Sequence, residues 1–316
     1  MAKSTKAPQR VTIERMSLSL ERTLRSELRS EKTIYSYLLS VRLLSEFLSA
    51  RGHDLTVDVS TDDLRDFITE QSIRRKLVSG KYGGSPATAL VRYKSLKQFF
   101  RHCVLEDELD VSPMDRMTAP PVKDSLVPVV SDDVLARLLK MRSGKTFVDR
   151  RDTAILRVFL DTGCRKAEVT NLRIGDLDEK NQTITVLGKG DKPRLVPYGA
   201  KTGTAIDRYL RVLEREQTDR VTPEGKLWVG RQGPLSTSGI DDVLHRMCDD
   251  AGVPRLHWHQ LRHTFAHTWL ANGGNEGDLM SNAGWSSRSM LDRYAKSAQV
   301  ERAHAAAKRM SLGDRV

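Results

Sequence analysis

Apolar residues recur at helical spacing through most of this chain, and this pattern limits the fold more than any other sequence feature. Behind Ser30, a residue type that caps helix starts, they follow one another every three or four positions. These positions are Ile34, Leu38, Val41, Leu44 and Leu48. Further helix starts are indicated at Ser60 or Thr61 and at Ser85-Pro86, where proline takes the first helical position. The N-terminal hundred residues are therefore predicted to be helical.

The C-terminal part repeats the helical pattern, with one exception. Two short β-prone runs, 183–187 and 194–197, flank a glycine-rich segment around Lys189 and predict a hairpin. Helices are expected from Ser131, over 151–160 up to Gly163, over 202–215, over 238–251 and from near His259. We predict a mainly α fold with a small β-sheet.

Prolines at 120, 121 and 128 mark the best domain boundary, because proline resists helix formation and favours an extended backbone. A length of 316 residues also suits two domains. The predicted organisation is an N-terminal extension (1–29), a helical domain (30–117), a linker (118–128), a second domain (129–298) and a C-terminal tail (299–316).

Composition excludes several classes of protein. No apolar stretch approaches the roughly 18 residues that a membrane helix needs, and the basic, polar N-terminus does not resemble a secretory signal. The cysteines, Cys103, Cys164 and Cys248, are scattered and have no metal-ligand spacing, which indicates a reducing compartment. We expect a cytoplasmic protein in which the cysteines are small buried apolar residues.

Charge indicates the kind of partner. Lys and Arg number 52 against 41 Asp and Glu, a net charge of +11, and no acidic residue occurs from Gln71 through Leu105. Such segregation favours a face that meets phosphates, because each Lys or Arg set against a phosphate releases counterions. The candidate DNA-binding residues in this stretch are Arg74, Arg75, Lys76, Lys81, Arg92, Lys94, Lys97 and Arg101.

Several residues could take part in catalysis, although each of them, considered alone, could equally have an ordinary structural role. Arg165 follows a helix-ending glycine, and Glu168 three residues later can hold its guanidinium, as in a common surface ion pair. His259 and Arg262 share one helical face and can address a single oxyanion. The histidines at 259, 263 and 267 lack a carboxylate in metalloprotease spacing, so we expect no metal.

Three more candidates are Lys189 at the hairpin tip, Trp285, and Tyr294 nine residues after it. Basic hairpin tips often serve solubility, and most Trp and helical Tyr residues serve packing. The evidence that these residues are catalytic comes from their order in the chain.

Together the ordered motifs resemble the tyrosine recombinases, the phage integrase family, over about residues 30–300, with Xer-like and Cre-like features. The motifs are Thr162-Gly-Cys-Arg-Lys-Ala-Glu168, Gly188-Lys-Gly190, His259-Gln-Leu-Arg-His263 and Trp285 before Tyr294. Cys164 and Val169 stand where the family usually has leucine, and Trp285 where histidine is commoner. The N-terminal helices resemble the family's core-binding domain, which implies a two-domain DNA clamp.

The resemblance implies a catalytic series. Tyr294 would attack a DNA phosphate to give a 3′-phosphotyrosyl link, and Arg165 and Arg262 would bind the non-bridging oxygens. His259 would accept the tyrosine proton, and Lys189 would protonate the leaving 5′-oxygen. Trp285 would donate a hydrogen bond, and Glu168 would play a supporting part. No metal or other cofactor is implied.

It also implies partners. These are double-stranded DNA with short inverted-repeat core sites, a homo-tetramer on paired sites formed from free monomers, and an accessory directionality factor. The tail from Gln299 would dock into a neighbouring protomer, and the enzyme would associate with the nucleoid. Integration, transposition and resolution remain open as biological roles. The alternatives are a type IB topoisomerase-like enzyme and a catalytically silent architectural DNA-binding protein.

Overall fold

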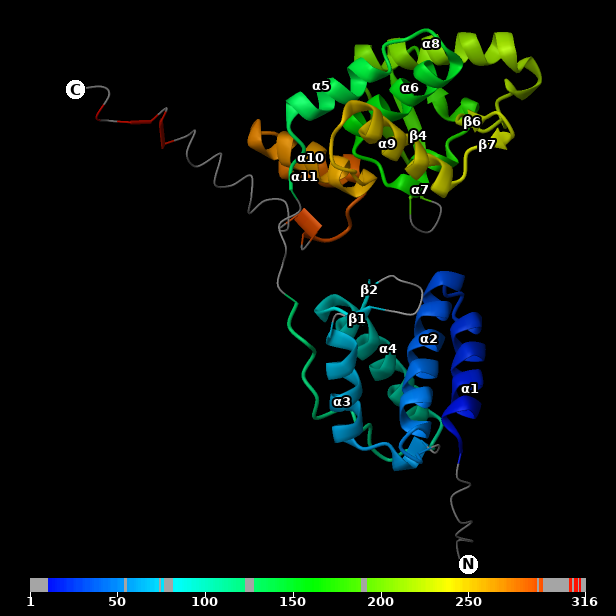
Figure 1. The fold of residues 1–316 in the computed structure, drawn as a ribbon, viewed down its shortest axis with the longest axis vertical. Coiled ribbons are helices and arrows are strands. Elements are labelled where there is room, and N and C mark those ends of the chain that lie inside the picture. The colour runs from blue at the N-terminus through cyan, green and yellow to red at the C-terminus, as the bar shows by residue number, and fades with distance from the viewer. Residues whose placement is uncertain are drawn as a thin grey trace, which may run out of the picture. The chain divides into compact units, whose positions relative to one another are not determined.

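The chain divides into two compact units, residues 1–123 and 124–316, each described here by itself (Figure 1). The computed structural model describes residues 11–53, 56–73, 75–76, 82–122, 128–188, 192–288, 290–291, 307–308, 310–311 and 313. The division falls inside the predicted linker, whose residues 123–127 lie outside this described part.

The first unit is a helical bundle. It contains α1 (Ile13–Ser26), α2 (Glu31–Ser49), the 3-10 turn Thr56–Asp58, α3 (Thr61–Ser72) and α4 (Pro86–Leu105). The side chains of Ser30, Ser60 and Ser85 accept hydrogen bonds from the first turns of α2, α3 and α4, so the predicted helix starts are confirmed. A short antiparallel pair, β1 (Arg75–Lys76) and β2 (Tyr82–Gly83), lies between α3 and α4.

Helix α1 corrects the sequence prediction. Residues 1–29 were expected to form an extension, but Ile13, Met16, Leu20 and Leu24 are buried along one side of α1. They join the same apolar core as residues of α2, α3 and α4. The spacing of three and four residues places them on one helical stripe, which must be covered by other helices to be stable. The first unit therefore includes this helix.

The second unit is mainly helical around a small sheet. Its helices are α5 (Asp132–Met141), α6 (Phe147–Thr162), α7 (Lys166–Asn171), α8 (Ala200–Glu216), α9 (Thr237–Ala251), α10 (Trp258–Ala271) and α11 (Glu276–Ala283). Two 3-10 turns, Ile174–Asp176 and Thr218–Arg220, and the short pair β6 (Val229–Gly230) and β7 (Gly233–Pro234) also belong to it. The mainly α fold class with small sheets is confirmed.

The central sheet has the order β3-β4-β5, formed by Leu177–Asp178, Thr183–Leu187 and Pro193–Pro197. Strands β4 and β5 pair antiparallel with Val186 opposite Arg194, and Gly188 N donates to Lys192 O at 2.9 Å. The predicted hairpin is confirmed, and β3 extends it to three strands. Its tip, residues 189–191, lies outside the described residues.

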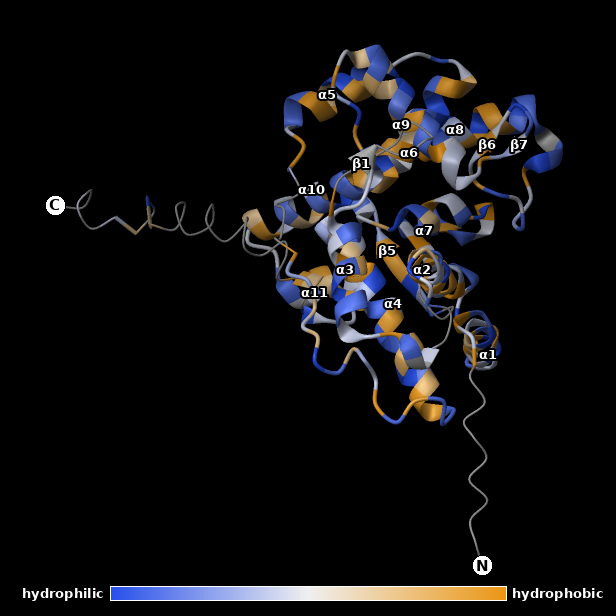
Figure 2. Cartoon of the chain, turned by 60° about the horizontal axis from the view of Figure 1, so that its bottom comes forward, coloured by the Kyte–Doolittle hydropathy of each residue, from blue (hydrophilic) through white to orange (hydrophobic). Residues whose placement is uncertain are grey.

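Apolar side chains concentrate between the elements of each unit. Figure 2 shows hydrophobic and hydrophilic positions alternating around the helices. In the second unit Phe159 stacks on Trp258 with ring centroids 4.0 Å apart, and Tyr209 stacks on Trp228. The three cysteines are buried, as predicted. Within the described part of the chain, no helix is long and apolar enough to cross a membrane.

Candidate active site

The site begins where α6 ends. Gly163 adopts a left-handed conformation (φ 56°), and a side chain there would collide with the ring of Phe265. The chain then turns so that Arg165 occupies the position before α7. The predicted helix end and the predicted arginine at a new helix start are both present.

Glu168 lies one turn into α7 and holds Arg165 in two ways. Arg165 donates from its backbone N to Oε2 and from Nη1 to Oε1, both at 2.8 Å. Burial alone would raise the pKa of Glu168, but hydrogen bonds from Arg194 and Arg165 bring that pKa below its ordinary value. Glu168 is therefore an anion that orients its neighbours.

Arg194, on β5, is a site residue that the sequence reasoning missed. Its Nη1 and Nη2 donate to Oε1 and Oε2 of Glu168 at 3.1 and 2.8 Å, and its Nε donates to Asn282 O at 3.0 Å. Nη2 also lies 3.7 Å from the sulfur of Cys164. An arginine at the start of a predicted strand carries no signal of these contacts, because its partners come from distant parts of the sequence.

Arg262 reaches the same region from α10. It donates from Nη1 to Gly163 O at 2.6 Å and from Nη2 to Ala283 O at 2.8 Å. Its guanidinium carbon lies 5.3 Å from the centroid of the Trp285 ring, a cation–π arrangement. Arg262 is buried, whereas the side chain of Arg165 is 38% exposed.

The histidines of α10 differ in exposure. His259 is exposed one turn before Arg262, and its ring lies 6.1 Å from that of His263. His263 is buried, and burial, followed by the charges of His259 and His267, lowers its pKa to about 4. His263 is thus a neutral packing residue at ordinary pH. No group of side chains suited to holding a metal occurs among the described residues.

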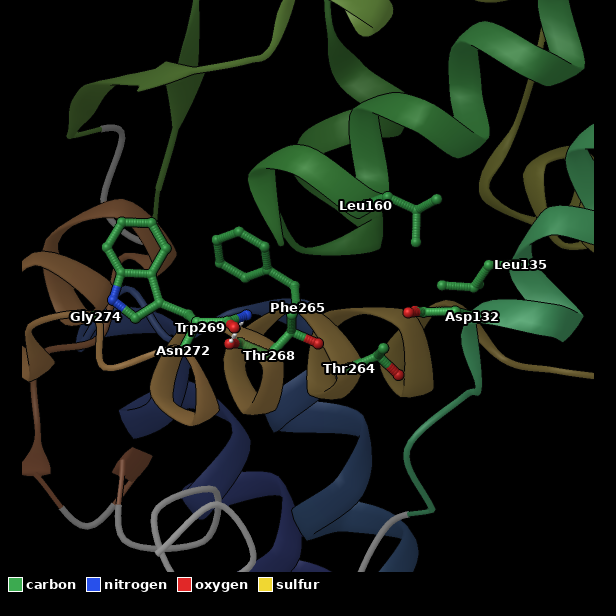
Figure 3. Close-up of a pocket in the computed structure, with 9 residues that line it drawn as sticks. All are labelled: Asp132, Leu135, Leu160, Thr264, Phe265, Thr268, Trp269, Asn272 and Gly274. Atoms are coloured by element: carbon green, nitrogen blue, oxygen red, sulfur yellow. Dashed lines mark hydrogen bonds between the residues drawn. The ribbon is translucent and has the colours of Figure 1, made fainter. Parts of the chain in front are cut away.

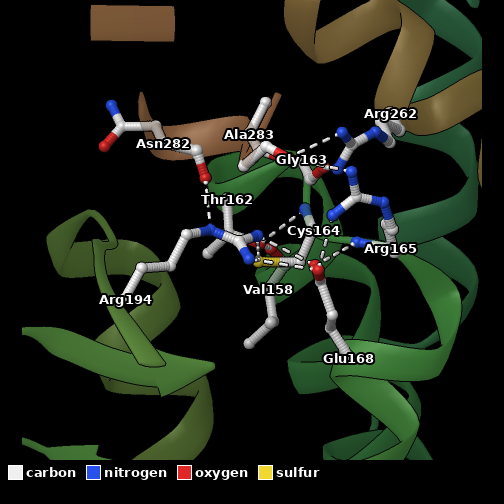
Figure 4. Close-up of polar contacts among 11 residues, drawn as sticks. Val158, Thr162, Gly163, Cys164, Arg165, Glu168, Arg194, Arg262, Asn282 and Ala283 are labelled. Carbon is white, nitrogen blue, oxygen red and sulfur yellow. Dashed lines mark hydrogen bonds and ion pairs between the residues drawn. The ribbon is translucent and has the colours of Figure 1, made fainter. Parts of the chain in front are cut away.

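The three arginines converge on one end of α11, as Figure 4 shows. Arg194, Arg262 and Arg165 donate to the carbonyls of three successive residues, Asn282, Ala283 and Gly284. The last carbonyls of a helix lack partners within it and carry the negative end of its dipole. The guanidinium groups satisfy them and hold the chain just before Trp285.

Trp285 is 7% exposed and packs in a small apolar cluster with Leu270, Leu279 and Leu291. This cluster anchors the segment that leads toward Tyr294. Tyr294 and Lys189 themselves lie outside the described residues, so their predicted positions stay predictions. Two described residues of the arginine cluster lie near them in the sequence: Arg194 follows the hairpin tip, and Gly284 lies ten residues before Tyr294.

Charge makes this cluster suitable for an anion. Three guanidinium groups gather here, and the Glu168 carboxylate can neutralise only one of them. Donors remain, because Arg165 uses two of its side-chain N–H groups in the contacts above and a guanidinium has five. The geometry can bind a phosphate group.

The predicted DNA-binding residues of the first unit separate in the structure. Lys94, Lys97 and Arg101 are exposed on one face of α4 and line a hollow of about 360 Å³. Arg92 instead faces α2, where its Nη1 donates to Ser40 Oγ at 3.0 Å, and burial lowers its pKa. That guanidinium is engaged between two helices, apart from the exposed Lys94, Lys97 and Arg101, and its assignment as a DNA-binding residue stays a prediction.

The remaining predicted DNA-binding residues are not placed. Arg74 and Lys81 lie outside the described residues, and for Arg75 and Lys76 only the β1 backbone is described. Asp110 and Asp115 also line the hollow of α4, so the basic face is bordered by acidic residues. Basic residues that are separated from acidic ones along the sequence thus lie beside acidic residues in the folded unit.

Comparison with known proteins extends these observations. The profile of the phage integrase family matches residues 129–301. The tyrosine recombinase XerC of Oceanobacillus iheyensis is 28% identical over 274 residues, covering 84% of this chain and 85% of the relative. XerC of Corynebacterium efficiens is 31% identical over 249 residues, covering 78% of this chain and 74% of the relative.

Solved structures share the fold. The XerH site-specific recombinase bound to its palindromic difH substrate superposes with a TM-score of 0.71 at 19% identity, covering 92% of this chain and 84% of that one. The Tn1549 transposon integrase in complex with transposon right end DNA superposes with a TM-score of 0.72 at 18% identity. The match covers 96% of this chain and 100% of that one.

The family profile and the recombinase relatives define an enzyme that breaks and rejoins DNA. The chain belongs to the phage integrase family. It is a site-specific tyrosine recombinase, and the resemblance seen in the sequence is confirmed.

Proposed function

We propose that Tyr294 is the nucleophile of this recombinase and that Arg165 and Arg262, within the arginine cluster, receive the scissile phosphate. Attack by the phenolate oxygen on phosphorus gives a 3′-phosphotyrosyl link and releases a 5′-hydroxyl. The observation that supports this most is the convergence of Arg165, Arg194 and Arg262 on the chain segment just ahead of Trp285 and Tyr294.

The two predicted clamp arginines play different parts. Arg165, with an exposed side chain and unused donors, contacts the non-bridging oxygens directly. Arg262 is more enclosed and adds positive charge close to the phosphate while holding Ala283 and Gly163. Preorganised donors of this kind stabilise charge that develops in the transition state.

His259 accepts the tyrosine proton, since it is exposed on the face of α10 that also carries Arg262. Lys189 protonates the leaving 5′-oxygen from the tip of the β4–β5 hairpin. Trp285 can donate a hydrogen bond but cannot shuttle a proton, and Glu168 supports Arg165 and Arg194.

The partners follow from the family and from the surface charge. The neighbours include a λ integrase dimer bound to a core site and a λ integrase tetramer bound to a Holliday junction. We expect this chain to be a monomer in solution, to bind core sites through Lys94, Lys97 and Arg101, and to assemble as a tetramer on paired sites. An accessory directionality factor would act on that assembly.

The tail from residue 299 is proposed to dock on a neighbouring copy. The second unit has an apolar pocket of about 450 Å³ between α5, α6 and α10 (Figure 3). Leu135, Leu160, Phe265 and Trp269 line it, and the tail carries Val300 and a run of alanines. Deleting residues after Ala298 should weaken assembly on paired sites more than binding to one site. Equal losses would contradict docking.

The test of the proposed function is a trap for the covalent intermediate. The protein is incubated with DNA from either side of its gene, nicked so that the cleaved end diffuses away, and protein-linked DNA is detected on denaturing gels. An adduct at one short inverted repeat that disappears in Tyr294→Phe, with DNA binding retained, is expected. Adducts at many sequences would indicate a topoisomerase-like enzyme, and binding without an adduct an architectural protein.

Lys189 is tested with a modified leaving group. Lys189→Ala should slow cleavage of ordinary DNA but spare a substrate whose 5′ leaving group is a thiol, because a thiolate leaves without a proton. Equal slowing of both substrates would show that Lys189 is not the general acid.

A further inference from the structure

Arg194 lies at the base of the hairpin that carries Lys189. It lies on β5 opposite Val186, three residues after the last residue of the hairpin tip (residues 189–191). All three nitrogens of its guanidinium make contacts within the protein: Nε with Asn282 O, and Nη1 and Nη2 with the Glu168 carboxylate. Its side chain is 15% exposed. Arg194 is built into the site and does not face outward like a DNA-contacting residue.

The bidentate contact determines where Glu168 can point. Glu168 accepts four hydrogen bonds, two from Arg194 and two from Arg165. Its side chain is only 5% exposed, so water cannot replace a missing arginine easily. With Arg194 gone, the carboxylate would be held by Arg165 alone, and both groups could rotate together. The orientation of Arg165 therefore depends on Arg194.

The contact with Asn282 adds a second constraint. Gly284 has a left-handed conformation (φ 64°), and a β-carbon there would lie 2.9 Å from Cζ and from Nη1 of Arg194. The main chain at the end of α11 thus fits closely against this guanidinium. One side chain on the hairpin joins the start of α7 to the segment that precedes Trp285.

We propose that Arg194 is a positioning residue for strand cleavage. It holds Glu168 so that Arg165 presents its guanidinium to the scissile phosphate, and it makes no contact with DNA. This proposal rests on the proposed function, because it assumes that Arg165 binds the phosphate.

The test compares adduct formation in single-turnover reactions on two nicked substrates. One has an ordinary scissile phosphate, and the other has a methylphosphonate, in which a methyl group replaces a non-bridging oxygen and removes the negative charge. The variants are Arg194→Lys, which keeps the charge but cannot bind both carboxylate oxygens and Asn282 O together, and Arg165→Ala. Arg211→Ala is the matched control, because it breaks an exposed ion pair with Asp207 on α8.

On the ordinary substrate Arg194→Lys should be slower than wild type by about 10- to 100-fold, the cost of a misplaced catalytic group. Arg211→Ala should match wild type, and all proteins should bind DNA equally. On the methylphosphonate, Arg194→Lys and Arg165→Ala should both return to within about 3-fold of wild type, because less charge needs to be neutralised. A wild-type rate for Arg194→Lys on the phosphate, or equal slowing on both substrates, would overturn the proposal.

A second pair of variants covers the case in which Arg194→Lys fails to fold. Glu168→Gln removes the carboxylate charge and leaves Arg194 without its counter-charge, whereas Glu168→Gln with Arg194→Gln removes one charge of each sign; both keep hydrogen-bonding groups. If Arg194 acts through Glu168, the double variant should be within about 3-fold of the single one, whereas independent roles would multiply the two defects. A wild-type enzyme that forms no Tyr294-dependent adduct would instead refute the proposed function, and this inference with it.

Discussion

Replacement of Gly284 by alanine would separate backbone strain from the placement of Arg194. Gly284 and Gly252 both end helices with left-handed backbones, at φ 64° and 61°. At Gly252 the nearest atom to a new β-carbon is Arg137 Nη2, at an ordinary 3.8 Å. At Gly284 the β-carbon would lie 2.9 Å from two atoms of Arg194. The two substitutions share the strain and differ in the collision.

The expected magnitudes follow from these contacts. A left-handed alanine costs about 1–2 kcal/mol, so Gly252→Ala should lower the stability of its domain by that amount. Each kcal/mol lowers Tm by roughly 2–4 °C for a domain of this size. In Gly284→Ala the guanidinium, the end of a long side chain, must also move. Loss of its hydrogen bonds to a charged group adds about 1.5–3 kcal/mol.

Activity should separate the two variants more clearly. Adduct formation by Gly252→Ala should match wild type, while Gly284→Ala should be slower by about 100-fold, because a displaced Arg194 no longer holds Glu168. Thermal unfolding followed by circular dichroism gives the stabilities, and nicked DNA gives the rates, both below the unfolding range. Equal rates for the two alanine variants would refute the link between the end of α11 and the phosphate site.

Three further predictions concern other parts of the molecule. Combined replacement of Lys94, Lys97 and Arg101 by alanine should lower the slope of log K against log salt by about 0.9 per lost contact, measured by fluorescence anisotropy. Arg92→Ala, which faces Ser40, should leave that slope unchanged, and a change as large as in the triple variant would contradict the placement of Arg92. Because His263 has its pKa lowered from 6.5 to about 4, it contributes stability above pH 6.5 that is lost as the pH falls toward 4. Urea unfolding of His263→Asn should therefore depend less on pH over that range than wild type does, and parallel profiles would argue against this assignment. Asp152→Asn should destabilise by about 3–5 kcal/mol in urea unfolding, because it leaves the buried guanidinium of Arg151 without its counter-charge, and a loss under about 1 kcal/mol would show that the pair is unimportant.

Local signals predicted much of the fold. Serine caps located the starts of α2, α3 and α4, because a cap acts on the first turn of its own helix. The contact between Arg165 and Glu168 was also predictable, since residues three apart share a helical face. The strand pair β1–β2 was not, because two-residue strands are too short to show a period.

Features that depend on tertiary structure could not be predicted. The apolar stripe of α1 is set among charged residues, and its stability comes from packing on other helices. Arg194 has the sequence setting of an exposed strand residue, and only the fold brings it to Glu168. Arg92 belongs to the acid-free stretch, yet its position two residues before Lys94 turns it to another face of α4.

The acceptors at the end of α11 are main-chain carbonyls, and this has a consequence for how the sequence can vary. The three arginines contact the path of the backbone at residues 282–284 and none of the side chains attached to it. Asn282 could therefore be exchanged for many residues without disturbing the network, whereas position 284 accepts glycine alone, since there the arginine occupies the place of a side chain. Within this single turn, position 282 should therefore tolerate substitution, whereas position 284, two residues later, should not.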